Sequence, residues 1–168
     1  MSATPLSLKG RALRYLAARE HSRAELERKL ASHESEPGEL ARALDELAAK
    51  GFISETRVME SVLHRRASKL GAGRVMQELR QKGLGDEALA EAADRLRSTE
   101  LDRAREVWRK KFGGHRGSKG SSQEDDPGRS EGALGPAERA RQMRFLAARG
   151  FSGDVVRRVV DGSFDESD

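Results

Sequence analysis

One pattern governs what this chain can fold into: apolar side chains recur every three or four residues in segment after segment. In residues 40–47, for example, the apolar positions are Leu40, Ala43, Leu44 and Leu47. This spacing places them on one face of a helix, and nine segments between residues 8 and 161 show it. Runs of β-branched and aromatic residues are almost absent, so the sequence predicts an all-α protein without a sheet.

Local signals place several helix ends. Ser22 followed by Glu25 has the form of a capping box at a helix start. Pro37 fits the first turn of the next helix. Three helix ends are marked by a glycine between a basic and an apolar residue, at 50–52, 82–84 and 149–151, and we expect Phe52 to pack back onto the helix before it. These signals divide the first part of the chain into short helices of about ten residues.

The nine segments fall into three groups of three, and short identities support an internal repeat. Glu25-Leu26-x-x-Lys29 matches Glu78-Leu79-x-x-Lys82 at the second helix of its group. One segment covers 86–96, and the next group starts at Leu101. A pair of such short helices cannot bury its apolar stripe alone, so neighbouring groups should stack. We therefore expect three tandem three-helix repeats, at 8–54, 55–98 and 99–161, that form an elongated curved helical solenoid.

Three other segments lack the helical pattern, and we expect the first of them to be disordered. They are the start, residues 1–7, an acidic end, residues 162–168, and an interruption at 113–136. The interruption holds seven glycines, four serines and two prolines in 24 residues. Such a segment has too few apolar side chains to offset the entropy cost of ordering, so we predict a flexible Gly/Ser-rich loop inside the third repeat.

The basic residues are concentrated in the middle of the chain. Residues 1–56 carry nine basic and nine acidic side chains, whereas residues 57–119 carry sixteen basic and nine acidic ones. This asymmetry favours a polyanionic partner or an acidic protein groove, although the cations could equally serve only to solvate helix faces. Our candidate contact residues are Arg57, Arg65, Lys69, Arg74, Arg80, Lys82, Arg109, Lys110, Lys111, Arg157 and Arg158.

Patterns typical of enzymes and metal sites are missing. The chain has no cysteine, no phosphate-binding or nucleophile-elbow motif, and four scattered histidines, so we assign no catalytic, metal or cofactor residue and expect no cofactor. Gly71-Ala72-Gly73 is interpreted as a tight turn between helices, and Trp108 as a core residue. With no long apolar segment and no secretory leader, the sequence indicates a cytoplasmic protein.

Several longer stretches resemble the RecX family of regulatory proteins. The strongest is residues 70–84, Leu-Gly-Ala-Gly-Arg-Val-Met-Gln-Glu-Leu-Arg-Gln-Lys-Gly-Leu. The stretches 12–26, 44–53 and 144–158 are also similar, and together they cover residues 8–161 in the family's order. The chain departs from the family after Leu30, where the usual glycine is missing, and in the long loop of the third repeat.

The resemblance implies a fold of three tandem three-helix repeats and a binding protein without enzymatic activity. The implied partner is the RecA recombinase, alone and as a filament on single-stranded DNA. Binding would restrain the ATPase, recombinase and co-protease activities of RecA, and so regulate DNA repair and the SOS response. We expect a monomer that does not bind membranes, and direct contact with single-stranded DNA is left open beside contact with RecA.

Two other interpretations compete with this one. Residues 22–53 imitate a helix-turn-helix, which suggests a DNA-binding transcription regulator. A winged version would need a β-hairpin next, yet residues 55–70 have a helical pattern. The other interpretation is a helical-repeat scaffold that binds proteins only.

Overall fold

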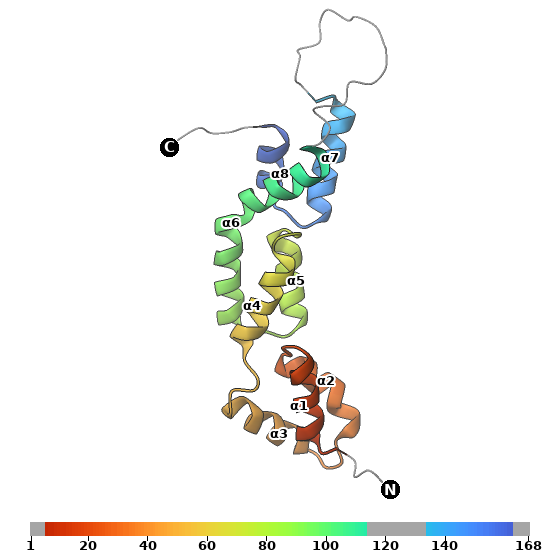
Figure 1. Ribbon diagram of the computed structural model, residues 1–168, viewed down its shortest axis with the longest axis vertical. Coiled ribbons are helices and arrows are strands. Elements are labelled where there is room, and N and C mark those ends of the chain that lie inside the picture. The colour runs from red at the N-terminus through yellow and green to blue at the C-terminus, as the bar shows by residue number, and fades with distance from the viewer. Residues whose placement is uncertain (1–5, 114–133, 163–168) are drawn as a thin grey trace, which may run out of the picture. The chain divides into compact units, whose positions relative to one another are not determined.

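The computed structural model describes residues 6–113 and 134–162 of the 168-residue chain. Every regular element in this part is helical, so the predicted all-α class is confirmed. The elements, labelled in Figure 1, are α1 (Leu8–Ala18), α2 (Arg23–Leu30), the 3₁₀ turn η1 (Ala31–His33), α3 (Glu39–Ala49), α4 (Glu55–Arg66), α5 (Ala72–Gln81), α6 (Asp86–Phe112), α7 (Pro136–Ala148) and α8 (Gly153–Val160). Most of the predicted disordered start, flexible loop and acidic end lies outside the described residues.

Helix α6 differs from the prediction because it is one continuous helix of 27 residues where the pattern indicated two segments. No glycine or proline separates Leu96 from Leu101. Ser98 and Thr99, which often end helices, instead donate their hydroxyls to the Arg95 carbonyl at 3.0 and 3.2 Å and so stay within the helix. The expected repeat boundary at residues 98–99 therefore falls inside a helix. The described residues form eight α-helices, not nine.

The helix ends follow most of the local signals. Ser22 and Glu25 form the predicted capping box at the start of α2. Pro37 lies just before α3 rather than in its first turn, because Gly38 takes the cap position. Ser7, assigned to the disordered start, caps α1 by accepting a hydrogen bond from the Gly10 amide at 3.2 Å. The glycines of the three predicted stops all have positive φ, as a C-terminal helix cap requires.

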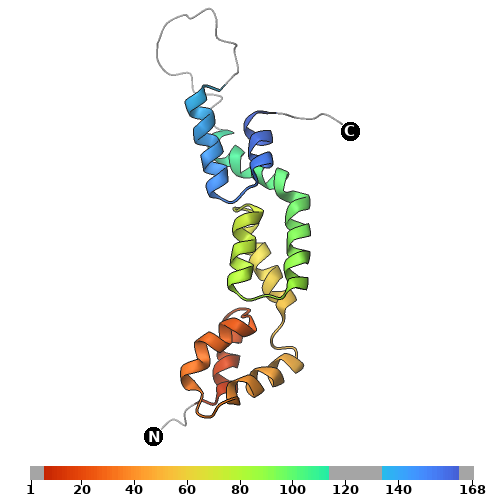
Figure 2. The same cartoon turned by 180° about the vertical axis from the view of Figure 1, so that it is seen from behind.

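The chain divides into two compact units. The first comprises Met1–Arg66 and Val75–Asp94. Within it, α1 contacts both α2 and α3 (Figure 1). Leu26, Leu30 and Leu44 are fully buried in the core of these three helices. Helix α4, most of α5 and the first part of α6 lie side by side (Figure 2), and they bury the side chains of Met59, Val62, Val75 and Leu79. We call these two groups of helices the first and second repeats.

The second unit comprises Ala67–Arg74 and Arg95–Asp168. Its core contains Ala104 of α6, Leu146 of α7 and three valines of α8. Trp108 packs against this core and donates its indole N–H to the Gln142 Oε1 atom at 2.8 Å. Its interpretation as a core residue is therefore confirmed. The later part of α6, with α7 and α8, forms the third repeat.

Candidate functional site

The candidate site is the set of basic side chains on these helices, and their partners divide it into two classes. Some of the predicted contact residues hold repeats together, while others project into solvent. The distinction matters because a cation that already has a buried partner cannot bind an external anion without breaking that contact.

Repeats one and two meet where the end of α5 approaches the start of α2. The Ser22 hydroxyl donates a hydrogen bond to the Lys82 carbonyl. The Lys82 ammonium pairs with the Glu25 Oε1 atom at 2.8 Å, and the Arg19 guanidinium contacts the same oxygen at 3.0 Å. We call the set Arg19, Ser22, Glu25 and Lys82 the ionic junction. It joins a capping box in one repeat to a helix end in the next.

Glu25 is the centre of this junction and is only 9% exposed. Burial raises the pKa of its carboxyl, but hydrogen bonds from Arg19, Lys82 and the Ser22 amide outweigh burial and lower the pKa to about 2. Glu25 is therefore ionised at neutral pH and holds two cations in place. His21 beside it is buried, and burial lowers the pKa of its imidazole below the ordinary value of 6.5.

Lys82, one of the predicted contact residues, is part of the ionic junction, and its side chain is only 12% exposed. Arg57 is also engaged internally. Its guanidinium pairs with Glu20 at 2.9 Å and donates to the Gly51 and Phe52 carbonyls at the end of α3. Lys82 and Arg57 therefore stabilise helix ends, which makes them weaker candidates for contact with an external partner. Sequence periodicity could not reveal their internal partners, Glu25 and Glu20.

Within the second unit, the turn before α5 meets the end of α7 through backbone atoms. The Gly71 amide donates to the Arg149 carbonyl at 2.9 Å, and the Gly73 amide donates to the Gly150 carbonyl at 3.0 Å. A Cβ atom on Gly71 would lie 2.2 Å from the Phe151 backbone nitrogen, so only glycine fits. We call the set Gly71, Gly73, Arg149 and Gly150 the glycine junction. Gly71 lies in a turn between helices, as interpreted, whereas Gly73 already belongs to the first turn of α5.

Two charged residues that the sequence did not single out support the glycine junction. The buried Glu100 carboxylate accepts hydrogen bonds from the Ala72 amide at 3.3 Å and the Ser152 amide at 3.2 Å. Arg103 donates to the carbonyls of Ala67 and Leu70 at 2.9 and 2.7 Å. Burial lowers the pKa of Arg103. A recognisable signal was available, because Glu100 stands midway between Leu96 and Ala104 in the apolar stripe of α6.

Arg74 also faces this junction. Its Nε atom donates to the Ala148 carbonyl at 3.3 Å, and its Cγ atom lies 2.6 Å from the position that a Cβ atom on Gly150 would take. The residue as a whole is nevertheless exposed. It therefore serves packing first, and any external contact would use only its outer atoms.

The other predicted cations of α4 and α5 are exposed. Arg65 contacts only the Ser61 carbonyl of its own helix, at 3.1 Å, among the interactions of the described residues. Lys69 lies in the turn after α4 and is exposed, as is Arg80 near the end of α5. Helix α4 buries Val62 and Leu63 while Arg65 stays exposed, so the helix has a core side and a basic side.

The end of α6 carries three consecutive exposed cations. Glu106 pairs with Arg109 at 2.9 Å and with Lys110 at 3.3 Å, while both cationic side chains stay about two-thirds exposed. Lys111 is exposed as well. Surface pairs of this kind contribute roughly 0.5 kcal/mol or less, so an incoming anion can displace Glu106. On α8, Arg157 pairs with Asp154 in the same way, and Arg158 is exposed.

Within residues 6–113 and 134–162, the acidic and histidine side chains form no group that could hold a metal ion. The helices of the same residues include none that is both long and apolar enough to cross a membrane. What the site offers chemically is hydrogen-bond donation and positive charge.

Comparison with known proteins gives consistent matches. Residues 9–47 match a family model described as the first three-helix domain of RecX, and residues 128–160 match the third three-helix domain. The chain is 52% identical to the regulatory protein RecX of Leptothrix cholodnii over 92% of this chain and 88% of that protein. It is 46% identical to the regulatory protein RecX of Ralstonia nicotianae over 95% of this chain and 89% of that protein.

Two solved structures share the fold. A crystal structure of a regulatory protein RecX aligns with a TM-score of 0.67 at 20% identity, covering 96% of this chain and 82% of that one. The crystal structure of RecX from Lactobacillus salivarius also gives a TM-score of 0.67, at 18% identity, and the alignment covers 92% and 93% of the two chains.

Proposed function

Because this chain belongs to the RecX family of regulatory proteins, we propose that it binds the RecA recombinase and its filament on single-stranded DNA and inhibits their activities. The inhibited activities are ATP hydrolysis, strand exchange and the co-protease function, so the protein regulates DNA repair. It acts by binding rather than by catalysis. The family membership, extending over nearly the whole chain, is the observation that carries this proposal.

The exposed cations support the proposal, and we propose that the contact is made through them. Arg65 projects from α4, Lys69 projects from the turn after it, and residues 109–111 project from the end of α6. Their contacts are to their own helix or to exposed carboxylates, so binding a phosphate or an acidic side chain costs little. We rank these five ahead of Arg80, Arg157 and Arg158, and place Arg57, Arg74 and Lys82 last because internal partners engage them.

The helix-turn-helix alternative finds less support in the first repeat. A recognition helix inserts exposed donors into the major groove. Helix α3, which would take that role, presents Asp45 and Glu46 to solvent beside Arg42. Residues 55–66 form helix α4 in the place where a winged helix needs a β-hairpin. Sequence-specific operator binding by the purified protein would favour this alternative.

The proposal is tested by adding the full-length protein to RecA on poly(dT) and following ATP hydrolysis. We expect a substoichiometric amount of protein to slow hydrolysis. Rates unchanged at a several-fold excess over RecA would contradict the proposal. A scaffold that binds other proteins without nucleic acid would leave RecA unaffected and would show no affinity for the filament.

A further inference from the structure

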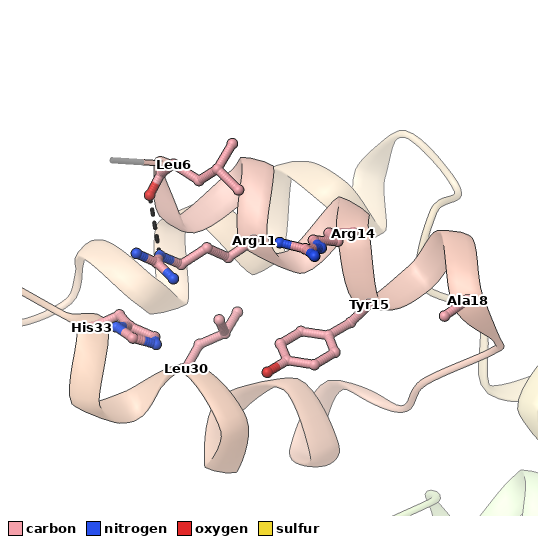
Figure 3. A pocket seen from close by; sticks show the side chains of 7 residues that line it. All are labelled: Leu6, Arg11, Arg14, Tyr15, Ala18, Leu30 and His33. Carbon is pink, nitrogen blue, oxygen red and sulfur yellow. Dashed lines mark hydrogen bonds between the residues drawn. The ribbon is translucent and has the colours of Figure 1, made fainter. Parts of the chain in front are cut away.

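A pocket of about 390 Å³ lies in the first repeat, and none of the predicted contact residues lines it. One face of α1 forms much of its wall, because the lining residues of this helix are spaced three or four positions apart. They are Arg11, Arg14, Tyr15 and Ala18. Leu6 before α1, Leu30 at the end of α2 and His33 in η1 complete the lining (Figure 3). The pocket therefore lies within one repeat and has the volume of a small-molecule site.

The arginines of this pocket have no acidic partner. The lining contains two arginines and a histidine, and it contains no acidic residue. Within residues 6–113 and 134–162, neither Arg11 nor Arg14 forms an ion pair. Glu34, which follows the lining histidine in the sequence, accepts hydrogen bonds from the Gly38 and Leu40 amides at 2.9 and 3.1 Å instead. An anion that enters the pocket therefore meets donors without a competing carboxylate.

Positive charge is present at both ends of the pocket. Figure 3 shows Arg11 and His33 at one end, where the Nε atom of Arg11 donates to the Leu6 carbonyl at 3.1 Å. This bond holds the guanidinium and leaves its two terminal nitrogens for a ligand. Tyr15 lies at the other end, and the Lys29 ammonium is 4.9 Å from the centre of its ring. Charge that is spread in this way suits a ligand with several negative charges.

The rest of the lining is apolar. Leu30 is fully buried beneath the pocket, while Leu6 is 50% exposed at its edge and Ala18 is exposed as well. An uncharged group of the ligand would cover Leu6 and Ala18, and the gain would be the area of apolar surface removed from water. The pocket therefore suits a polyanion that is attached to an uncharged, partly apolar body.

We propose that this pocket binds a nucleoside triphosphate, with the phosphates on Arg11 and Arg14 and the nucleoside against Leu6 and Ala18. Guanidinium groups are well suited to phosphate, because their fixed N–H donors can form two parallel hydrogen bonds to it. The lining has no carboxylate that could hold a magnesium ion beside the phosphates. The protein therefore binds the nucleotide with or without magnesium.

A strand of DNA fits this pocket less well than a free nucleotide. The pocket has room for about one nucleotide, and a strand brings a single charge with each nucleotide, whereas a triphosphate brings several charges to the same volume. Stacking of bases also needs an open aromatic face. Tyr15 has the Lys29 ammonium and the His21 ring as neighbours, the latter with 5.6 Å between ring centres, and they restrict its face.

The test measures binding of the fluorescent analogue N-methylanthraniloyl-ATP to the full-length protein by fluorescence anisotropy, without RecA or DNA. We expect saturable binding that persists when EDTA removes magnesium. Arg14→Glu should weaken binding about tenfold or more, because it replaces a donor by a repelling charge. Arg42→Glu, a matched reversal on α3 outside the lining, should leave the affinity unchanged. Because the assay contains no RecA, its outcome is separate from the test of the proposed function.

Competition distinguishes the charged and the apolar parts of the pocket. Unlabelled ATP should displace the analogue, tripolyphosphate should displace it more weakly, and adenosine should be the weakest competitor. Leu6→Asn should weaken the binding of ATP several-fold and leave the binding of tripolyphosphate unchanged, because only the nucleoside contacts this residue.

Three results would overturn the proposal. They are no saturable binding at millimolar analogue, equal effects of the Arg14 and Arg42 reversals, and equal competition by ATP and tripolyphosphate. If dT10 displaces the analogue more strongly than ATP does, the pocket is a nucleic-acid site and the proposal is also wrong. Thermal melts check folding, and Arg14→Gln replaces Arg14→Glu if the reversal unfolds the protein.

Discussion

The ionic junction and the glycine junction each join one helix end to the start of another helix, but with different chemistry. At the ionic junction the end of α5 meets the start of α2, and at the glycine junction the end of α7 meets the turn just before α5. The Lys82 carbonyl accepts from the Ser22 hydroxyl at the ionic junction, and the Arg149 carbonyl accepts from the Gly71 amide at the glycine junction. The ionic junction uses side chains, and charged groups surround it. The glycine junction uses backbone atoms that lie too close together to leave room for a side chain. The first should respond to pH, and the second to added volume.

The glycine junction should be broken most severely by a single methyl group. Gly71→Ala places a Cβ atom 2.2 Å from the Phe151 nitrogen and 2.3 Å from the Gly150 carbonyl carbon. Backbone atoms cannot move aside without breaking both hydrogen bonds, so we expect the free energy of unfolding to fall by about 3 kcal/mol or more. Denaturant unfolding measures this decrease.

Gly135→Ala is the matched control, because its added Cβ meets no atom within 4 Å. It should change stability by less than about 0.5 kcal/mol. If Gly71→Ala and Gly135→Ala prove equally mild, the close backbone approach does not exist.

The ionic junction should be broken next most severely by Glu25→Gln. This change leaves the Lys82 ammonium poorly exposed and without its counter-ion, and it weakens the contact with Arg19. We expect a decrease of about 2 kcal/mol in stability by thermal or denaturant unfolding. Lys82→Met should cost less, since Glu25 keeps Arg19 and the Ser22 amide. If Lys82→Met lowers the free energy of unfolding more than Glu25→Gln does, Glu25 is not the main stabilising residue of the ionic junction.

Acid should distinguish the two junctions. The pKa of Glu25 is lowered in the folded protein, so its stabilising contribution is present above the ordinary pKa of 4.5 and disappears as pH falls toward about 2. The imidazole of His21 also has a lowered pKa, and its burial opposes protonation once pH falls below 6.5.

Unfolding measured from pH 7 to pH 3 should show the wild type losing stability, with a shallower decrease below pH 4.5 in Glu25→Gln. Gly73→Ala, at the glycine junction, should lower stability by the same amount at every pH, because no titrating group is removed. An identical acid dependence of Glu25→Gln and wild type would show that Glu25 does not titrate as described.

The smallest effect is expected from deleting residues 118–133, which belong to neither junction. These residues lie outside the described part of the chain, and the prediction rests on their composition and on loop-closure entropy, which changes slowly with length. Stability should change by about 1 kcal/mol or less. Non-cooperative unfolding of the deletion variant would show that the segment contributes to packing.

Much of the fold could be predicted from the sequence because it depends on short-range signals. Apolar spacing located the helices, and the capping box and the basic-Gly-apolar triplets located their ends. The continuity of α6 was missed because Ser98 and Thr99 were not recognised as compatible with a helix interior. Phe52, expected to pack back onto the end of α3, is 46% exposed.

The candidate site was harder to predict because exposure and pairing depend on residues far apart in sequence. Lys82 and Lys69 look equivalent in the sequence, yet the partner of Lys82 is 57 residues away and Lys69 lies in an exposed turn.

The central claim is that exposed cations bind the partner while internally paired cations hold the repeats together. The most direct measurement is the affinity of full-length protein for RecA filaments on single-stranded DNA, comparing Arg65→Glu/Lys69→Glu with Arg42→Glu/Lys50→Glu. Both double variants change the charge equally, and all four positions are exposed. We expect the first to weaken binding about tenfold or more, with an unchanged melting temperature, and the second to bind like wild type.

The salt dependence of the same binding tells which partner the cations touch. If Arg65 and Lys69 bind phosphates, the first double variant should also lower the log–log salt slope by roughly 0.7 to 0.9 for each phosphate that is no longer bound. If they bind protein, the reversal would weaken filament binding and leave the salt slope for single-stranded DNA alone unchanged. Wild-type affinity and wild-type inhibition in Arg65→Glu/Lys69→Glu would contradict the claim for these two residues. The charges of residues 109–111 would then be the next to reverse.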